Sequence, residues 1–63
     1  HLEIDSEEMV ISYRIFRADG SLVVDNSANK RNFKIDFSRW SADQYILQWT
    51  TASGTFSDLV IKR

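Results

Sequence analysis

The chain has 63 residues, a length that allows one domain. It contains no cysteine, which excludes disulfide bridges and thiolate metal sites. Its formal net charge of -1 predicts no strong attraction to nucleic acid. Apolar residues make up 43% of the chain, enough for a core, yet no apolar run approaches the roughly 18 residues of a membrane span. We therefore expect a single small domain, residues 1–63, without a membrane span and without a nucleic-acid partner.

The first half of the chain alternates apolar and polar residues with the period of two that is typical of strands. Leu2–Ile4 predicts a short opening strand, and Met9–Phe16 predicts a second. Asp19-Gly20 predicts a hairpin turn before the apolar run Leu22–Val24, because Asp-Gly tolerates the backbone angles of tight turns. The polar segment Asp25–Arg31 is expected to be a connection between strands.

The second half predicts strands at Phe33–Phe37, Tyr45–Thr51 and Thr55–Ile61, with a turn at Ala52-Ser53-Gly54. About six short strands at this spacing predict an all-β fold, an immunoglobulin-like antiparallel β-sandwich. Such sandwiches usually have seven strands or more, so this one is expected to be incomplete. Same-face alternation predicts one core of Ile11, Tyr13, Ile15, Ile35, Phe37, Trp40, Tyr45, Leu47 and Leu59.

Residues with catalytic or metal-binding chemistry are few. The only histidine, His1, stands at the chain end, and a catalytic triad needs a histidine held between a nucleophile and a carboxylate. Asp5, Glu7 and Glu8 could suggest a calcium site, but they lack the ligand spacing of a calcium loop and are interpreted as a solvated loop. We expect a protein that is not an enzyme and has no metal and no cofactor.

Two further groups of residues suggest binding. Basic residues concentrate at Lys30, Arg31, Lys34 and Arg39, and the net negative charge favours a solvated surface over a nucleic-acid site. Trp40 and Trp49 could form a platform for sugar rings, although both fit a small core that needs large side chains. An exposed tryptophan would favour the sugar platform, and buried tryptophans would favour the core.

Three segments together resemble the C-terminal sorting domains of the type IX secretion system. Residues 11–23 resemble the alternating strand and Ile-Tyr-x-x-x-Gly-x-x-Val segment of that family, residues 35–47 its Ile-Asp-Leu-Ser-x-Leu-x-x-Gly-x-Tyr-x-Leu box, and residues 56–63 its closing strand. A sister group of small secreted β-sandwich modules has nearly the same boxes. Asp43 stands where the family usually has glycine, and the family's upstream Asn-Pro box and first strand are absent.

The resemblance implies a non-catalytic sorting or anchoring domain at the C-terminal end of a larger secreted protein, which reaches the cell surface through the periplasm. The residues that it implies for partner binding are Val60, Ile61, Lys62 and Arg63. The expected partners are secretion or anchoring machinery proteins and the preceding domain of the same protein. The alternative function is a carbohydrate-binding or structural accessory module.

The strand that the sandwich lacks predicts an additional kind of association. Its absence leaves a neighbouring strand with unpaired backbone N–H and C=O groups, which are a template for pairing with another chain. The chain has no proline that would protect such an edge. We therefore also expect a homodimer by strand pairing, or pairing with the preceding domain.

Overall fold

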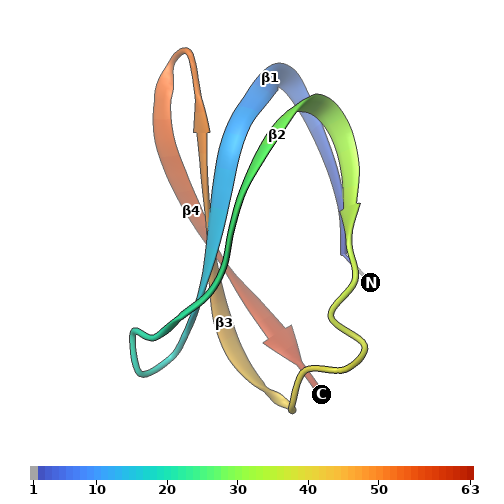
Figure 1. Ribbon diagram of the computed structural model, residues 1–63, viewed down its shortest axis with the longest axis vertical. Coiled ribbons are helices and arrows are strands. Elements are labelled where there is room, and N and C mark those ends of the chain that lie inside the picture. Colours follow the sequence, from blue (N-terminus) through green and yellow to red (C-terminus); the bar gives the residue numbers. More distant parts are fainter. Residues whose placement is uncertain (1) are drawn as a thin grey trace.

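The computed structural model describes residues 2–63 and contains four β-strands in that range. They are β1 (Leu2–Arg17), β2 (Leu22–Ile35), β3 (Asp43–Thr51) and β4 (Gly54–Lys62). The strands form one antiparallel sheet in the order β2-β1-β3-β4, and no helix occurs among the described residues (Figure 1). The prediction of an antiparallel all-β fold is thus confirmed.

The structure has four strands where about six were predicted, because two of them are long. β1 joins the two strands expected at Leu2–Ile4 and Met9–Phe16, and β2 joins Leu22–Val24 to the strand that begins at Phe33. The polar segment Asp25–Arg31 lies inside β2, so its prediction as a connection is wrong. β2 is an edge strand whose polar side chains reach solvent while its backbone pairs with β1.

Irregular pairing bends the β1–β2 hairpin strongly. The pair Asp5↔Asn32 is followed by Val10↔Lys30, so that residues 6–9 of β1 stand opposite Arg31 alone. Extra residues on one strand disrupt the ladder and increase its bend and twist. A second register shift lies close by on β2, where Asn29 has a φ of 51°. Figure 1 shows both strands arching at this place.

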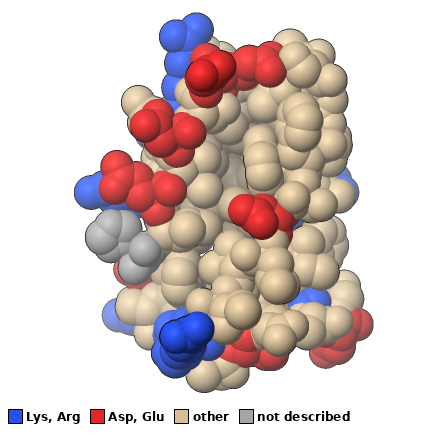
Figure 2. All heavy atoms as spheres, turned by 180° about the vertical axis from the view of Figure 1, so that it is seen from behind, with Lys and Arg blue, Asp and Glu red and all other residues tan. Residues whose placement is uncertain are grey.

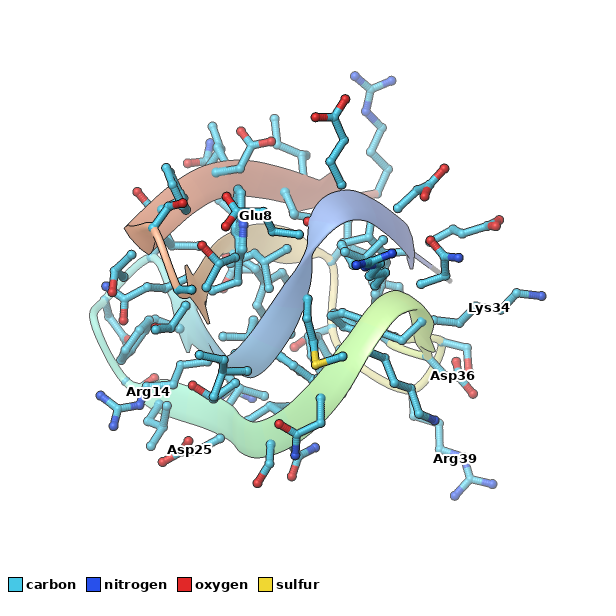
Figure 3. All side chains as sticks on the ribbon, turned by 90° about the horizontal axis from the view of Figure 1, so that it is seen from above. Glu8, Arg14, Asp25, Lys34, Asp36 and Arg39 are labelled. Atoms are coloured by element: carbon cyan, nitrogen blue, oxygen red, sulfur yellow. The ribbon has the colours of Figure 1, made fainter. Side chains whose placement is uncertain are left out.

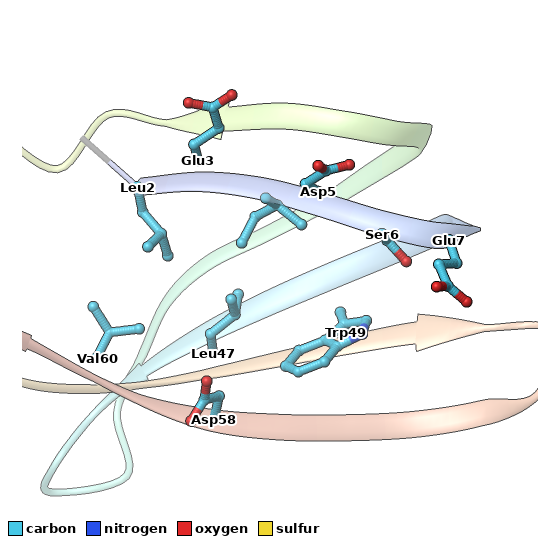
Figure 4. Close-up of a pocket in the computed structure, with 10 residues that line it drawn as sticks. Leu2, Glu3, Asp5, Ser6, Glu7, Leu47, Trp49, Asp58 and Val60 are labelled. Atoms are coloured by element: carbon cyan, nitrogen blue, oxygen red, sulfur yellow. The ribbon is translucent and has the colours of Figure 1, made fainter.

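The bend carries the first part of β1 and the last part of β2 across the inner face of β3 and β4, as Figure 4 shows. The buried core between these two layers consists of Ile15, Ile35, Tyr45 and Leu47. Partly buried residues from both layers pack against it, among them Ile4, Phe33 and Trp49. The central part of this core encloses a void of only about 10 Å³. A bent sheet thereby acts as its own second layer.

Two residues of the predicted core face solvent. Ile11 is 44% exposed, whereas its neighbour Val10 is fully buried, because the bulge shifts the alternation of β1 by one residue. Leu59 is 54% exposed, because it pairs with Ile46 on the outer face. The inner position next to it is Val60, which stands opposite Tyr45. The other predicted core residues are buried or pack against the core.

Both predicted turns occur where the sequence places them. Gly54, at the end of the β3–β4 turn, has a φ of 138°, and Gly20, between β1 and β2, has a φ of 90°. The Gly20 N–H donates to Arg17 O at 2.9 Å. Asp19 Oδ1 accepts from both the N–H and the hydroxyl of Ser21, which holds the pKa of Asp19 below its ordinary value. The turn needs a residue that adopts positive φ without strain.

Replacing Leu47 with Ala should lower the free energy of unfolding by about 2–5 kcal/mol, because it removes a side chain that is 4% exposed at the centre of the core. The matched control is Ile46→Ala, the next residue, which is 40% exposed on the other face. Denaturant unfolding measures both variants. Equal losses would contradict the assignment of faces in β3.

Replacing Gly20 with Val should destabilise the chain by about 1–3 kcal/mol, because a β-branched residue is strained at this φ. A Cβ at Gly20 would meet no atom within 4 Å, so the loss would report the backbone conformation and not a clash. Gly20→Asn should cost less, since Asn tolerates positive φ. A Val variant as stable as the Asn variant in thermal unfolding would contradict this turn geometry.

Candidate functional site

The segment between β2 and β3, residues 36–42, is held in place by side chains of the motif that prompted the family resemblance. Asp36 Oδ1 accepts from Ser38 N at 3.0 Å, and hydrogen bonds from Ser38 hold the pKa of Asp36 below its ordinary value. Trp40 N donates to Phe37 O at 3.0 Å. Tyr45 Oη donates to Ser41 O at 2.7 Å. These hydrogen bonds hold residues 36–42 against the end of β3, so this part of the motif has a structural role.

Asp43, which stands where the sorting domains that the chain resembles usually have glycine, begins β3 without a positive φ. Among the described residues only Asn29 is a non-glycine residue with positive φ. Asp43 Oδ1 accepts from Gln44 N at 2.7 Å. The entry into β3 therefore does not require glycine in this chain.

The four residues that the resemblance implies for partner binding point in different directions. Val60 faces inward and packs against the core. Lys62 Nζ donates to Ser38 O at 3.0 Å and also to Trp40 O, so its ammonium ties the end of β4 to the connecting segment. Ile61 is 52% exposed, and Arg63 is exposed beyond the strand. Only Ile61 and Arg63 are therefore presented to a partner.

Both tryptophans pack against the core and are half-buried. The Trp40 ring lies 5.7 Å from Phe37 and 5.1 Å from Tyr45 between centroids. Trp49 stacks on Phe56 with a centroid separation of 5.9 Å. These aromatic contacts are those of packed side chains, which favours the core interpretation. Trp49 also borders an open groove.

The acidic residues near the start of the chain lie in strand β1, so their prediction as a loop is wrong. Glu7 and Glu8 lie within β1, where residues 6–9 bulge. Both carboxylate oxygens of Glu8 accept from Ser53 Oγ at 2.8 Å, which joins the bulge to the β3–β4 turn. Within residues 2–63 no group of three or more potential ligands is arranged to hold a metal ion. His1 lies outside the described residues.

Only part of the basic group lies beside aromatic residues, since Lys30 and Lys34 line a pocket of about 180 Å³ together with Tyr13 and Phe33. Lys34 and Arg39 point away from the molecule in Figure 3, and Phe33 packs toward the core. Arg14 Nε and Asp25 Oδ1, 3.5 Å apart, form the one ion pair found among the described residues, and both side chains are more than half exposed. Acidic atoms gather at the upper left of the face shown in Figure 2, and others lie in its largely uncharged centre. This charge distribution does not favour an anionic ligand on that face.

An open groove of about 460 Å³ lies between the two layers, on the side where the sheet does not close (Figure 4). Its apolar lining comes from Leu2, Ile4, Leu47, Trp49 and Val60, and its polar lining comes from Glu3, Asp5, Ser6, Glu7 and Asp58. No lysine or arginine lines it. Clefts of roughly 300–1,000 Å³ with apolar walls and a few placed polar groups are typical of ligand-binding sites. The sequence pattern did not predict this groove, because residues of β1 and β4 meet there only after the sheet bends.

A row of apolar side chains crosses the outer face of the sheet. Leu22 pairs with Phe16, Phe16 with Ile46, and Ile46 with Leu59, so the row runs over all four strands. Leu22, Ile46 and Leu59 are exposed. Exposed Ile61 lies two residues along β4, on the same face as Leu59. A contiguous exposed apolar row of this kind is typical of a protein-binding surface.

Comparison of the chain with family models, with curated proteins and with solved structures gives no match. The resemblance to type IX sorting domains is not tested by this result and stays a prediction.

The described residues also include no helix that is long and apolar enough to cross a membrane.

Replacing Lys62 with Met should destabilise the chain by about 1–2 kcal/mol, because two main-chain carbonyls of the connecting segment lose a charged donor. The control Lys34→Met removes an exposed lysine of β2 and should change stability by less than about 0.5 kcal/mol. Thermal unfolding of both variants at equal concentration measures the difference. Identical melting curves would show that the Lys62 clamp does not hold the segment.

Proposed function

We propose that the chain is a non-catalytic sorting or anchoring domain, the C-terminal part of a larger secreted protein that is delivered to the cell surface. The observation that carries the proposal is the exposed apolar row on the outer face, to which β4 contributes Leu59. A sorting domain acts by binding other proteins, and exposed apolar surface is what such binding requires. Its proposed partners are secretion or anchoring machinery proteins.

The position of β4 supports a role for the last residues. β4 is an edge strand with no neighbour on one side among the described residues. Ile61 and Arg63 are exposed there, next to the apolar row. Unpaired edges also support the proposed strand-paired homodimer, or pairing with the preceding domain. Val60 and Lys62 contribute to partner binding indirectly, because they hold in place β4, the strand on which Ile61 lies.

We further infer that the bent sheet is an incomplete immunoglobulin-like sandwich. Its two layers share one core, as the two sheets of a sandwich do. The hydrogen bond from Tyr45 Oη to Ser41 O also resembles the tyrosine corner of such folds, in which a tyrosine hydroxyl binds the backbone a few residues upstream. The shared core and the tyrosine hydrogen bond both support an immunoglobulin-like sandwich.

The alternative function, a carbohydrate-binding or structural accessory module, has less support. A sugar platform needs a tryptophan face that is open to solvent, and both tryptophans pack against other rings, although Trp49 also lines the open groove. The sorting interpretation expects packed tryptophans. The observed packing therefore favours sorting over sugar binding.

The proposal is tested with a reporter protein fused ahead of the chain in a bacterium that has type IX secretion. The double substitution Ile61→Asp with Arg63→Glu should lower surface delivery about tenfold or more, because it places acidic groups where a partner would bind an apolar and a basic one. Periplasmic accumulation and the melting temperature of the isolated chain should change little. Deleting residues 60–63 is a weaker test, since it also removes Val60 and Lys62 from the fold.

Met9→Asp is the matched control, because Met9 is 51% exposed and Ile61 is 52% exposed, and Met9 lies in the bulge of β1, outside the apolar row. It should affect delivery less than the double substitution does if the last residues are those that partners contact. Wild-type delivery by the double variant would rule out the proposed role of Ile61 and Arg63.

A further inference from the structure

The groove between the two layers is bordered by strand edges that have no strand partner among residues 2–63. The first half of β1 pairs with β2 on one side only, since pairing of β1 with β3 begins at Ser12. β4 likewise pairs with β3 alone. Residues 2–7 of β1 and two residues of β4 line the groove. Free backbone groups and an apolar floor therefore lie together, which is the arrangement that accepts an added strand.

One charged group projects into this groove from the inner face of β4. Asp58 stands opposite Leu47 in the ladder, and Val60 and Phe56 occupy the adjacent inward positions. Figure 4 shows the Asp58 carboxylate between β4 and Leu47, on the side of the groove. Asp58 takes part in no ion pair within residues 2–63. Its Oδ1 accepts only from the N–H of the next residue, at 2.8 Å.

The surroundings of Asp58 determine the chemistry that complements it. The groove lining contains Glu3, Asp5 and Glu7 besides Asp58, and no cation. Asp58 is exposed and therefore open to a guanidinium or ammonium group, and charge-assisted hydrogen bonds to such a group are stronger than neutral ones. The stacked rings of Trp49 and Phe56 lie at the neighbouring ladder position, within reach of cation–π contact.

We propose that the groove binds an extended strand of a partner protein, in which an arginine or lysine lies between two apolar residues on the inward side. The backbone of the strand pairs with the free edge of β1, the cation binds Asp58, and the apolar residues cover Val60 and Trp49. A strand separates inward side chains by two residues, which matches the alternation of Phe56, Asp58 and Val60. The groove is distinct from the outer apolar row, so this proposal does not depend on the sorting role.

A single extended segment fits this groove better than a second copy of the chain. The groove lies between two packed layers, and a strand of a folded copy would bring its paired neighbours with it. The free edge of β2, with its register shifts and positive-φ residue, is twisted, which hinders edge-to-edge pairing. A partner segment that has no sheet of its own meets no such obstacle.

Binding of short fluorescent peptides to the full chain tests the proposal. The test peptide alternates threonine with inward residues in the order valine, arginine, valine, and a second peptide has glutamate in place of arginine. The arginine peptide should bind the chain at least about tenfold more tightly, and added salt should weaken this preference. Equal binding of both peptides, or binding of neither, would overturn the proposal.

Three variants locate the site on the protein. Asp58→Asn keeps the size of the side chain and should remove the tenfold preference for arginine, whereas Asp58→Lys should favour the glutamate peptide. Asp25→Asn removes an exposed carboxylate of β2 outside the groove and should leave the preference unchanged. Melting temperatures show whether each variant is folded, and the reversal in Asp58→Lys cannot result from unfolding.

Sedimentation of the chain without peptide tests whether a second copy of the chain occupies the groove instead. A monomer at all concentrations, or a dimer that Asp58→Asn leaves intact because it pairs through a strand edge outside the groove, agrees with a partner strand. A dimer that Asp58→Asn dissociates would assign the groove to a second copy and overturn the proposed occupant. Unchanged arginine preference in the Asp58→Asn variant would also overturn the proposal.

Discussion

The bend in the β1–β2 hairpin is the constraint on which the rest of the structure depends. A flat sheet of four strands would leave Ile15, Leu47 and their neighbours on an open face, with nothing to cover them. The extra residues 6–9 of β1 bend the hairpin so that its far end covers that face. A chain without disulfides and with only 63 residues thereby obtains a core enclosed on two sides.

The same bend leaves one side of the molecule open. The first half of β1 lies away from β3, so the pairing between these two strands begins only at Ser12. The groove occupies the space that results, and its lining includes core residues such as Leu47 as well as the charged Asp58. A single geometric feature therefore produces both the buried core and the open groove beside it. Stability and binding capacity have a common origin in this fold.

Much of the fold could be predicted from the sequence, because local signals decide it. Asp19-Gly20 has the turn geometry that its residues favour, and Tyr45 and Leu47 are buried as their alternation indicates. The faces at Ile11 and Leu59 were misassigned for two different reasons. In β1 the inserted residues shift the phase although the sequence alternation continues. In β4 both phases carry apolar residues, so period alone cannot distinguish Leu59 from Val60.

The candidate sites were harder to predict than the strands. Lys62 belongs to the terminal residues that the resemblance implies for partner binding, but its ammonium binds the chain's own backbone at Ser38 and Trp40. The prediction of Leu59 as a core residue places its neighbour Asp58 on the outer face, which conceals the position of Asp58 in the groove. The groove itself depends on how far the hairpin bends, and a bend made by a bulge has no simple signature in composition or periodicity.

The strand order also determines when the core can form as the chain is synthesised. The β1–β2 hairpin is local and can form early, but its apolar side stays uncovered until β3 is available to pair with residues 12–17 of β1. β3 is the third of the four described strands, and its other partner, β4, is the last of them. Pairing of strands so distant in sequence is slow, because the loop between them must close first. Among the described strands, the core is therefore complete only when β3 and β4 have been synthesised.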